Sequence, residues 1–192
     1  MKQNKMGGKI EIIIGPMFSG KTSELLRRER IYKIIGISTI MVKFLGDIRY
    51  DCEKDEISTH DGIKNNAIVT KLISDIIPKI IPFECILIDE GQFFLDLCET
   101  CDYLANLGKI VIISALNGTF MRKCFSNVTN LISIADDITF LKSICEKCKN
   151  YASFTYRIDT QNQNEIQIGE KNMYVSLCRT CYNNSIINGE KK

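Results

Sequence analysis

The feature that most constrains this chain is the segment Gly15-Pro-Met-Phe-Ser-Gly-Lys-Thr22, which matches the phosphate-binding pattern G-x-x-x-x-G-K-[ST]. The apolar run that precedes it, Lys9 to Gly15, predicts a buried strand, and residues 22–35 predict a helix. The pattern requires this setting, because backbone N–H groups of the turn and the positive end of the helix bind phosphate oxygens together. In such a loop, Lys21 reaches the β- and γ-phosphates and the Thr22 hydroxyl binds Mg²⁺. The predicted phosphate-site residues are Gly15, Pro16, Met17, Phe18, Ser19, Gly20, Lys21 and Thr22.

Apolar runs and helical segments continue to alternate after this loop. Further strands are predicted at residues 37–44, 85–89, 109–114 and 138–142, helices at 95–107 and 126–135, and a short strand and helix within 68–79. Almost wholly apolar strands that alternate with helices favour a parallel sheet with helices on both faces. The predicted fold class is therefore α/β, with a P-loop NTPase-like sheet. Residues 45–66 are polar and are expected to form a long loop.

Two acidic residues follow the predicted buried strand at residues 85–89. A nucleotide site with a bound magnesium ion needs an acid at the end of a second strand, and Asp89 supplies it. Glu90 comes next and is a candidate general base that takes a proton from a hydroxyl acceptor. From the residues alone, Glu90 is equally well explained as a solvated loop residue or as the acid that begins a helix.

Nine cysteines are a large number for a chain of 192 residues. Cys145 and Cys148 form one C-x₂-C pair, and Cys178 and Cys181 form another, which together predict a tetrahedral zinc site. All four positions are filled by protein ligands, so the expected role is structural. A third pair, Cys98 and Cys101, lies in an amphipathic pattern and is expected to contribute buried core thiols.

The character of the sequence changes after Ser143, where it becomes polar, rich in asparagine and bracketed by cysteines. We expect two domains: an ATP-binding α/β domain at residues 1–143 and a small ribbon-like zinc domain at residues 144–192. The segment between the cysteine pairs is longer than in ordinary zinc ribbons, which suggests that something is held inside it.

Composition excludes some classes of partner. The formal net charge of +2 argues against nucleic acid or an anionic membrane as the main partner. No signal peptide or spanning run is evident, and free thiols suit a reducing compartment, so a cytoplasmic location is expected. Arg27, Arg28 and Arg30 are expected to form a solvated or subunit-contacting face.

With these motifs in place, the chain resembles the thymidine kinases of the cytosolic, zinc-containing type, the type II thymidine kinase family. The resemblance covers nearly the whole chain, and its motifs appear in family order. The matching segments are Gly15-Pro-Met-Phe-Ser-Gly-Lys-Thr-Ser-Glu-Leu25, Asp47-Ile-Arg-Tyr50, Thr59-His-Asp61, Asp89-Glu-Gly-Gln-Phe-Phe94, Leu116-Asn-Gly-Thr-Phe120 and the four zinc cysteines.

The resemblance implies transfer of the γ-phosphate of ATP to the 5′-hydroxyl of thymidine, and of deoxyuridine, which gives a nucleoside monophosphate for salvage of DNA precursors. It implies Mg²⁺ and a structural Zn²⁺ as cofactors, a homotetramer, and feedback inhibition by thymidine triphosphate. Glu90 is then the base that activates the 5′-hydroxyl. Asp47, Arg49, Asp89 and Gln92 join the phosphate loop in the ATP and magnesium site.

A nucleoside pocket is also implied by the resemblance, with a lasso loop between the cysteine pairs that grips the base through main-chain groups. Zinc pins this loop at its ends. The implied pocket residues are Met17, Phe93, Leu116, Phe120, Phe125, Ile166, Gln167, Ile168, Gly169 and Tyr174.

The sequence departs from the family at Asn117, where an aspartate is usual, and at Glu170, where a second glycine is expected. The phosphate loop and the cysteine pairs would also serve two other functions. A zinc-ribbon ATPase that binds nucleic acid needs a basic surface and aromatic side chains for stacking, which the low charge and the lack of tryptophan disfavour. A regulatory nucleotide-binding protein without catalysis is supported only by Asn117.

Overall fold

We describe the protein from a computed structural model, which covers residues 7–46, 56–58, 64–158 and 173–189. Its centre is a six-stranded sheet in the order β5-β2-β6-β7-β1-β8, and every neighbouring pair of strands is parallel. The α/β fold class is thus confirmed. The strands are β1 (Lys9–Gly15), β2 (Thr39–Phe44), β5 (Ile68–Thr70), β6 (Cys85–Ile88), β7 (Ile110–Leu116) and β8 (Asp137–Phe140).

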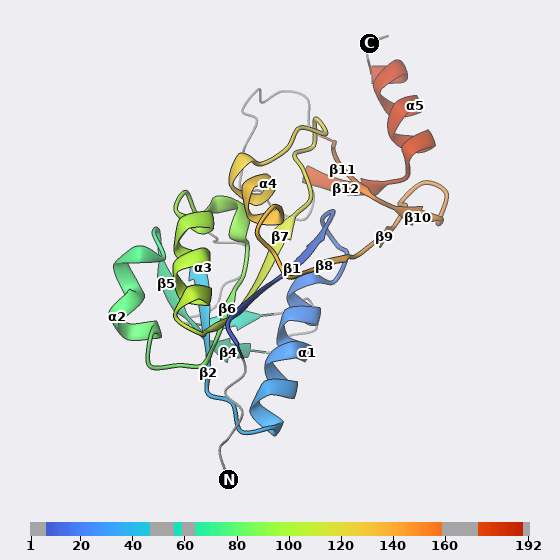
Figure 1. Cartoon of the computed structure of the whole chain (residues 1–192). Helices are drawn as coiled ribbons and strands as arrows, with labels where there is room; N and C mark the ends of the chain where they lie inside the picture. Colours follow the sequence, from blue (N-terminus) through green and yellow to red (C-terminus); the bar gives the residue numbers. More distant parts are fainter. Residues whose placement is uncertain (1–6, 47–55, 59–63, 159–172, 190–192) are drawn as a thin grey trace.

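Helices cover both faces of this sheet (Figure 1). One face carries α1, and the other carries α2, α3 and α4 with two short 3-10 turns. These elements are α1 (Lys21–Ile34), η1 (Ser74–Ile76), α2 (Ile77–Ile80), η2 (Gly91–Phe93), α3 (Leu97–Asn106) and α4 (Ser126–Ile132). Gly108 follows α3 with a φ of 82°, a left-handed conformation that suits glycine, and ends the helix as expected.

The alternation of side chains along each strand explains how both faces are buried. On β1, Ile12 and Ile14 face α3 and α4, whereas Ile13 faces α1. On β6, Ile86 and Ile88 face the first group, and Leu87 faces the second. The central strands are therefore apolar throughout, as a doubly covered parallel sheet requires.

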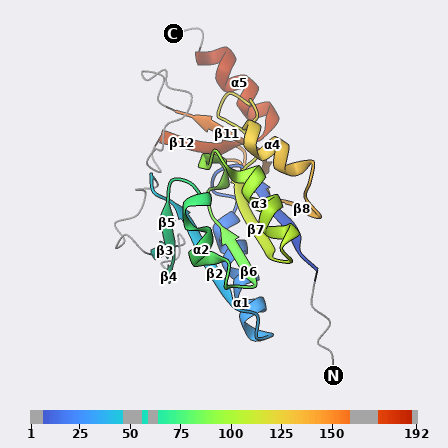
Figure 2. The same ribbon diagram turned by 60° about the vertical axis from the view of Figure 1, so that its left-hand side comes forward.

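The C-terminal segment, which we define as residues 143–158 and 173–189, lies beyond the carboxyl ends of the strands (Figure 2). Its strands form two antiparallel pairs, β9 with β10 and β11 with β12. Its small core contains Cys145, Ala152, Leu177 and Tyr182. The elements are β9 (Ser143–Ile144), β10 (Tyr151–Ala152), β11 (Phe154–Arg157), β12 (Tyr174–Leu177) and α5 (Arg179–Gly189).

Three expectations from the sequence need correction. The polar stretch at residues 45–66 contains an antiparallel pair, β3 (Glu56–Ser58) with β4 (Lys64–Asn66), whose backbone pairing the low β-propensity of lysine, glutamate and asparagine did not indicate. Arg28 does not belong to a solvated face, because its side chain is only 12% exposed and is bound by acids. Cys101 is buried as expected, but Cys98 is only partly buried. Within the described ranges, no helix is both long and apolar enough to span a bilayer.

Candidate nucleotide and phosphoryl-transfer site

The phosphate-binding loop connects β1 to α1 at the carboxyl edge of the sheet. A Cβ on Gly15 would lie 2.5 Å from the Leu141 carbonyl oxygen, so only glycine fits there. Phe18 and Gly20 have φ values of 60° and 81°, which curl the loop. The Lys21 ammonium donates a hydrogen bond of 2.8 Å to the Pro16 carbonyl oxygen across the loop. The positive charge is therefore already held over the turn that the motif assigns to phosphate.

Asp89 stands directly beside this loop. The Thr22 hydroxyl lies 3.0 Å from Asp89 Oδ2, and the Ser114 hydroxyl donates to Asp89 Oδ1. The three residues come from α1, the end of β6 and β7, so the parallel order of the sheet brings them together. Asp89 is 5% exposed, and its carboxylate and the Thr22 hydroxyl form the type of oxygen donor set that suits Mg²⁺.

Glu90 has an unusual backbone conformation for a residue with a side chain, with φ 54° and ψ 43°. This turn leads into η2 and directs the chain away from β6. The Gln92 amide donates a hydrogen bond of 2.5 Å to Glu90 Oε2, while Gln92 Oε1 accepts one of 3.0 Å from the Leu116 backbone N–H. Gln92 thus links the carboxylate of Glu90 to the end of β7.

The turn after Glu90 is held by Asn127 of α4. Its amide nitrogen donates to the carbonyl oxygens of Gln92 and Phe94 at 3.0 and 2.8 Å. Strained conformations near functional groups persist only when surrounding contacts fix them, and Asn127 supplies these contacts. Glu90 is therefore held by the Gln92 amide at its carboxylate, and the turn that follows it is held by Asn127.

Six residues expected to form the nucleoside pocket lie in the described part of the chain. Phe120 and Tyr174 lie with ring centroids 6.4 Å apart, although they come from different parts of the chain. The rings of Phe93 and Phe44 pack against each other, with 5.5 Å between their centroids. Phe125 lines a cavity of about 350 Å³ together with Gln92. Met17 is partly buried in the phosphate loop, and Leu116 is partly buried at the end of β7.

Six of the predicted site residues lie outside the described part of the chain. They are Asp47, Arg49, Ile166, Gln167, Ile168 and Gly169. Their roles stay predictions.

The four paired cysteines come together, as their spacing predicts. Their Sγ atoms all lie within 4.8 Å of one another, and those of Cys148 and Cys178 are 3.6 Å apart. Zn–S bonds of about 2.3 Å in tetrahedral geometry bring sulfur atoms to about 3.8 Å from each other, so the arrangement fits zinc. Burial acts to raise the pKa of the Cys145 thiol, but backbone N–H groups of Cys178, Cys148 and Lys147 favour its thiolate and lower its pKa to about 6. The pKa of Cys181 is instead raised to about 12, first by its hydrogen bond to Cys178.

The C-terminal segment is fastened to the loops of the sheet by hydrogen bonds. Asn117 donates from its side-chain amide to the Ser153 carbonyl oxygen at 3.1 Å, which explains how an asparagine is used at this position. The Tyr182 hydroxyl donates to the Phe120 carbonyl oxygen. Arg122 lies over the Tyr182 ring with 4.5 Å between its guanidinium carbon and the ring centroid.

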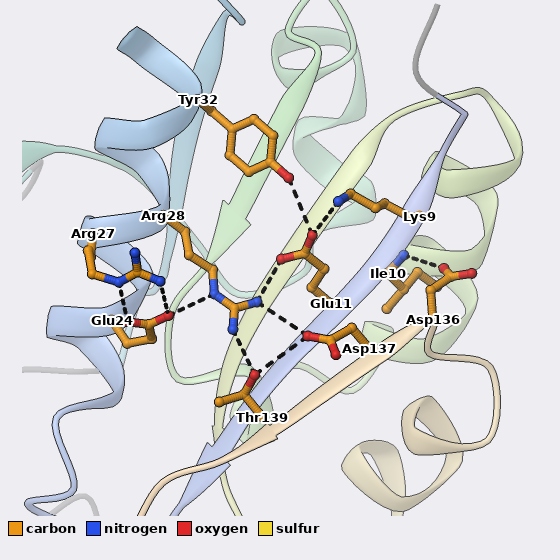
Figure 3. A network of polar contacts seen from close by, with 10 residues as sticks. All are labelled: Lys9, Ile10, Glu11, Glu24, Arg27, Arg28, Tyr32, Asp136, Asp137 and Thr139. Carbon is orange, nitrogen blue, oxygen red and sulfur yellow. Dashed lines mark hydrogen bonds and ion pairs between the residues drawn. The ribbon is translucent and has the colours of Figure 1, made fainter. Parts of the chain in front are cut away.

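A polar network between α1, β1 and β8 anchors the helix to the sheet (Figure 3). Arg28 contacts Glu24 of its own helix at 3.0 Å, Glu11 of β1 at 2.6 Å and Thr139 of β8 at 2.7 Å. Hydrogen bonds from Lys9 and Arg28 outweigh the effect of burial and lower the pKa of Glu11. Since α1 begins at Lys21, this network fixes the helix that carries the loop lysine.

Four further residues that contact the site were not predicted from the sequence: Ser114, Asn127, Thr155 and Ser176. Ser114 is the one polar residue inside an apolar strand next to the strand that ends in Asp89, and this signal could have been used. The other residues contact the site through partners far away in the sequence. No local pattern reports such contacts.

Comparison with known proteins identifies the family of this chain. The profile of the thymidine kinase family matches residues 8–182. The chain is 47% identical to a thymidine kinase of raccoon poxvirus over 178 residues, which cover 93% of this chain and 98% of the relative. It is 46% identical to a thymidine kinase of monkeypox virus, covering 92% and 97% of the two chains. It is 45% identical to one of vaccinia virus strain Western Reserve, with the same coverage. On this evidence, the chain belongs to the thymidine kinase family.

Proposed function

We propose that this protein is an ATP:thymidine 5′-phosphotransferase, which also accepts deoxyuridine. The observation that carries the proposal is the acid pair at the end of β6, where Asp89 contacts Thr22 of the phosphate loop and Glu90 follows in a fixed turn. This arrangement supports phosphoryl transfer, in which positioning and neutralisation of charge supply most of the catalysis.

In the proposed reaction, Glu90 takes the proton from the 5′-hydroxyl of the nucleoside. The 5′-oxygen forms a bond to the γ-phosphorus, and the bond between this phosphorus and the β,γ-bridging oxygen breaks, which releases ADP. Lys21 exchanges its hydrogen bond to Pro16 for contacts with phosphate oxygens. Gln92 keeps the Glu90 carboxylate oriented toward the hydroxyl. We propose that Met17, Phe93, Leu116, Phe120, Phe125 and Tyr174 line the nucleoside pocket.

Two metal ions are part of the proposal. Thr22 and Asp89 would hold Mg²⁺, which neutralises charge on the phosphates when bound. Cys145, Cys148, Cys178 and Cys181 would hold a structural Zn²⁺ with no open position. We also propose the division into domains at residues 1–143 and 144–192, with a lasso loop in the second.

Regulation, assembly and location follow the family resemblance and are proposals as well. We propose inhibition by thymidine triphosphate, a homotetramer and a cytoplasmic location. The location is supported by the free thiols in the described part of the chain, which suit a reducing compartment.

The base assignment is tested with Glu90→Gln, which keeps the shape of the side chain but cannot accept the proton. We expect turnover to fall by at least about 100-fold, because general bases contribute roughly 10²–10⁴-fold. ATP binding should be nearly unchanged. Glu84→Gln is the matched control, because Glu84 lies exposed at the opposite end of the same strand. Near-normal turnover of the Glu90 variant would remove Glu90 from the mechanism.

The substrate is tested with ATP, Mg²⁺ and each of the four deoxynucleosides in a coupled assay on the full chain. We expect turnover with thymidine and little with deoxycytidine or the purine nucleosides. Absence of turnover with every nucleoside, from protein that binds ATP, would overturn the proposed reaction. Stimulation of ATP hydrolysis by single-stranded DNA would favour a nucleic-acid-dependent ATPase instead.

A further inference from the structure

Met17 of the phosphate-binding loop is held through both of its backbone polar groups by the C-terminal segment. The backbone N–H of Met17 donates a hydrogen bond of 3.0 Å to the Thr155 hydroxyl oxygen. The carbonyl oxygen of Met17 accepts one of 2.5 Å from the Ser176 hydroxyl. These partners are separated from Met17 by 138 and 159 residues in the sequence.

The two hydroxyl groups form a matched pair in the fold. Thr155 on β11 lies opposite Ser176 on β12 in the antiparallel register, so one step of this ladder presents both groups side by side. Both residues are buried, with 5% and 3% of their surface exposed. A buried hydroxyl without a partner is costly, so these side chains strongly favour the one backbone conformation at Met17 that satisfies both.

A third hydroxyl extends this contact to the next residue of the loop. Ser143, at the start of β9, donates a hydrogen bond of 3.0 Å to the Phe18 carbonyl oxygen. Phe18 is the residue whose φ of 60° turns the loop. The C-terminal segment therefore contacts backbone groups at the point where the loop takes its special conformation.

We propose that Thr155 and Ser176 are positioning residues for ATP binding: together they hold the Met17 backbone, through the two peptide groups that flank it, so that the phosphate-binding loop is ready before the nucleotide arrives. The loop binds phosphate through backbone N–H groups, so its affinity depends on the fraction of molecules in which these groups already point inward. The inference rests on the proposed function, because it requires that this loop receives ATP.

The experiment compares Thr155→Val and Ser176→Ala with the wild-type chain. Valine matches the shape of threonine but cannot accept the Met17 hydrogen bond, and Ser176→Ala removes a single oxygen atom. Thr155→Ser keeps the hydroxyl and is the rescue variant. Thr100→Val is the matched control, because Thr100 is also 5% exposed but lies on α3 and bonds to Asp96. For each protein we would measure ATP binding by calorimetry, KM for ATP and for thymidine, zinc content and thermal stability.

We expect Thr155→Val and Ser176→Ala each to raise the dissociation constant and KM for ATP by about 3- to 10-fold, the range of one net hydrogen bond. KM for thymidine should rise less than KM for ATP, because Met17 is only one of the proposed nucleoside-pocket residues, and zinc content should not change. Thr155→Ser and Thr100→Val should bind ATP like the wild type. ATP binding within about 2-fold of wild type in both test variants would overturn the inference. An equal rise in KM for ATP and KM for thymidine together with loss of zinc would also overturn it, because this result would mean that the two residues have a purely structural role. If the wild type itself does not bind ATP, the proposed function fails first, and the two failures are thereby distinguished.

Discussion

Arg28 of α1 and Glu11 of β1 form an ion pair with 2.6 Å between Nη1 and Oε2, and their side chains are only 12% and 11% exposed. The same guanidinium binds Glu24 and Thr139, so one side chain ties the helix behind the phosphate loop to two strands of the sheet (Figure 3).

We predict that Arg28→Met lowers the free energy of unfolding by about 2 kcal/mol, because it leaves the Glu11 carboxylate buried with fewer donors. Urea denaturation measures this loss. The control is Arg27→Met, since Arg27 is 60% exposed in its side chain and surface ion pairs contribute at most about 1 kcal/mol. Equal losses in the two variants would contradict a special role for Arg28.

The stability of the protein should depend on the charge of Glu11 at low pH. Burial would raise the pKa of Glu11, but its hydrogen bonds to Lys9 and Arg28 hold this pKa below the ordinary value of 4.5. The Tyr32 hydroxyl also donates to this carboxylate. The unfolded chain therefore binds this proton more readily than the folded chain. The contribution of Glu11 is present above about pH 4.5 and is lost as the pH falls through the pKa in the folded state.

Glu11→Gln removes this titration. Urea unfolding of the variant and the wild type at several pH values should give a difference that is largest near pH 7 and shrinks below about pH 4.5. A difference that stays constant over this range would show that another group causes the acid sensitivity.

Loss of one zinc ligand should remove the metal. We predict that Cys178→Ser lowers the bound zinc, measured by elemental analysis, well below one ion per chain and lowers the unfolding temperature, because the small core of the C-terminal segment depends on it. Cys98→Ser is the control, because Cys98 lies on α3 outside the cluster. A full complement of zinc in Cys178→Ser would exclude the four-cysteine site.

Asn117→Asp should weaken the attachment of the C-terminal segment. The amide of Asn117 donates to the Ser153 carbonyl oxygen, and an aspartate would set a negative oxygen against that acceptor. We expect a loss of about 1–2 kcal/mol in urea unfolding. Asn184→Asp, at an exposed position of α5, should be nearly neutral. If the Asn117 variant is as stable as the wild type, this hydrogen bond does not contribute to stability.

Ser114→Ala should affect catalysis more than stability. Its hydroxyl donates to the Asp89 carboxylate, and without it the carboxylate loses a contact that orients it toward Thr22. We predict a fall in kcat/KM for ATP of about 3- to 10-fold, which corresponds to one net hydrogen bond. The assay should be repeated over a range of Mg²⁺ concentrations. An unchanged requirement for Mg²⁺ and unchanged kcat/KM would contradict this role.

Local patterns predicted much of this molecule well. The run KIEIIIG became β1 at the predicted residues, and the helix predicted to begin at Thr22 begins at Lys21. Both elements could be predicted because a run of apolar residues and helix propensity are properties of residues that are neighbours in the sequence. The cluster of four cysteines could be predicted equally well, because each C-x₂-C pair is visible in the local sequence.

Contacts that join distant segments were not predictable in this way. Arg28 looks like any charged residue on a helix, and only the position of β8 beside β1 reveals its partners. Thr155 and Ser176 are ordinary strand residues until the register of β11 with β12 points both at Met17. Such contacts depend on how the strands and helices are arranged in space. The spacing of apolar residues along the sequence does not determine that arrangement.

The position of β1 between β7 and β8 has a consequence for the protein during its own synthesis. Of the six strands in the central sheet, β1 leaves the ribosome first, but its partners are residues 110–116 and 137–140. At about 5–20 residues per second, the strand waits roughly 5–20 s before the first of them exists. During this interval the row of isoleucines on β1 has no sheet to join, and the nascent chain depends on other means to keep it from aggregation.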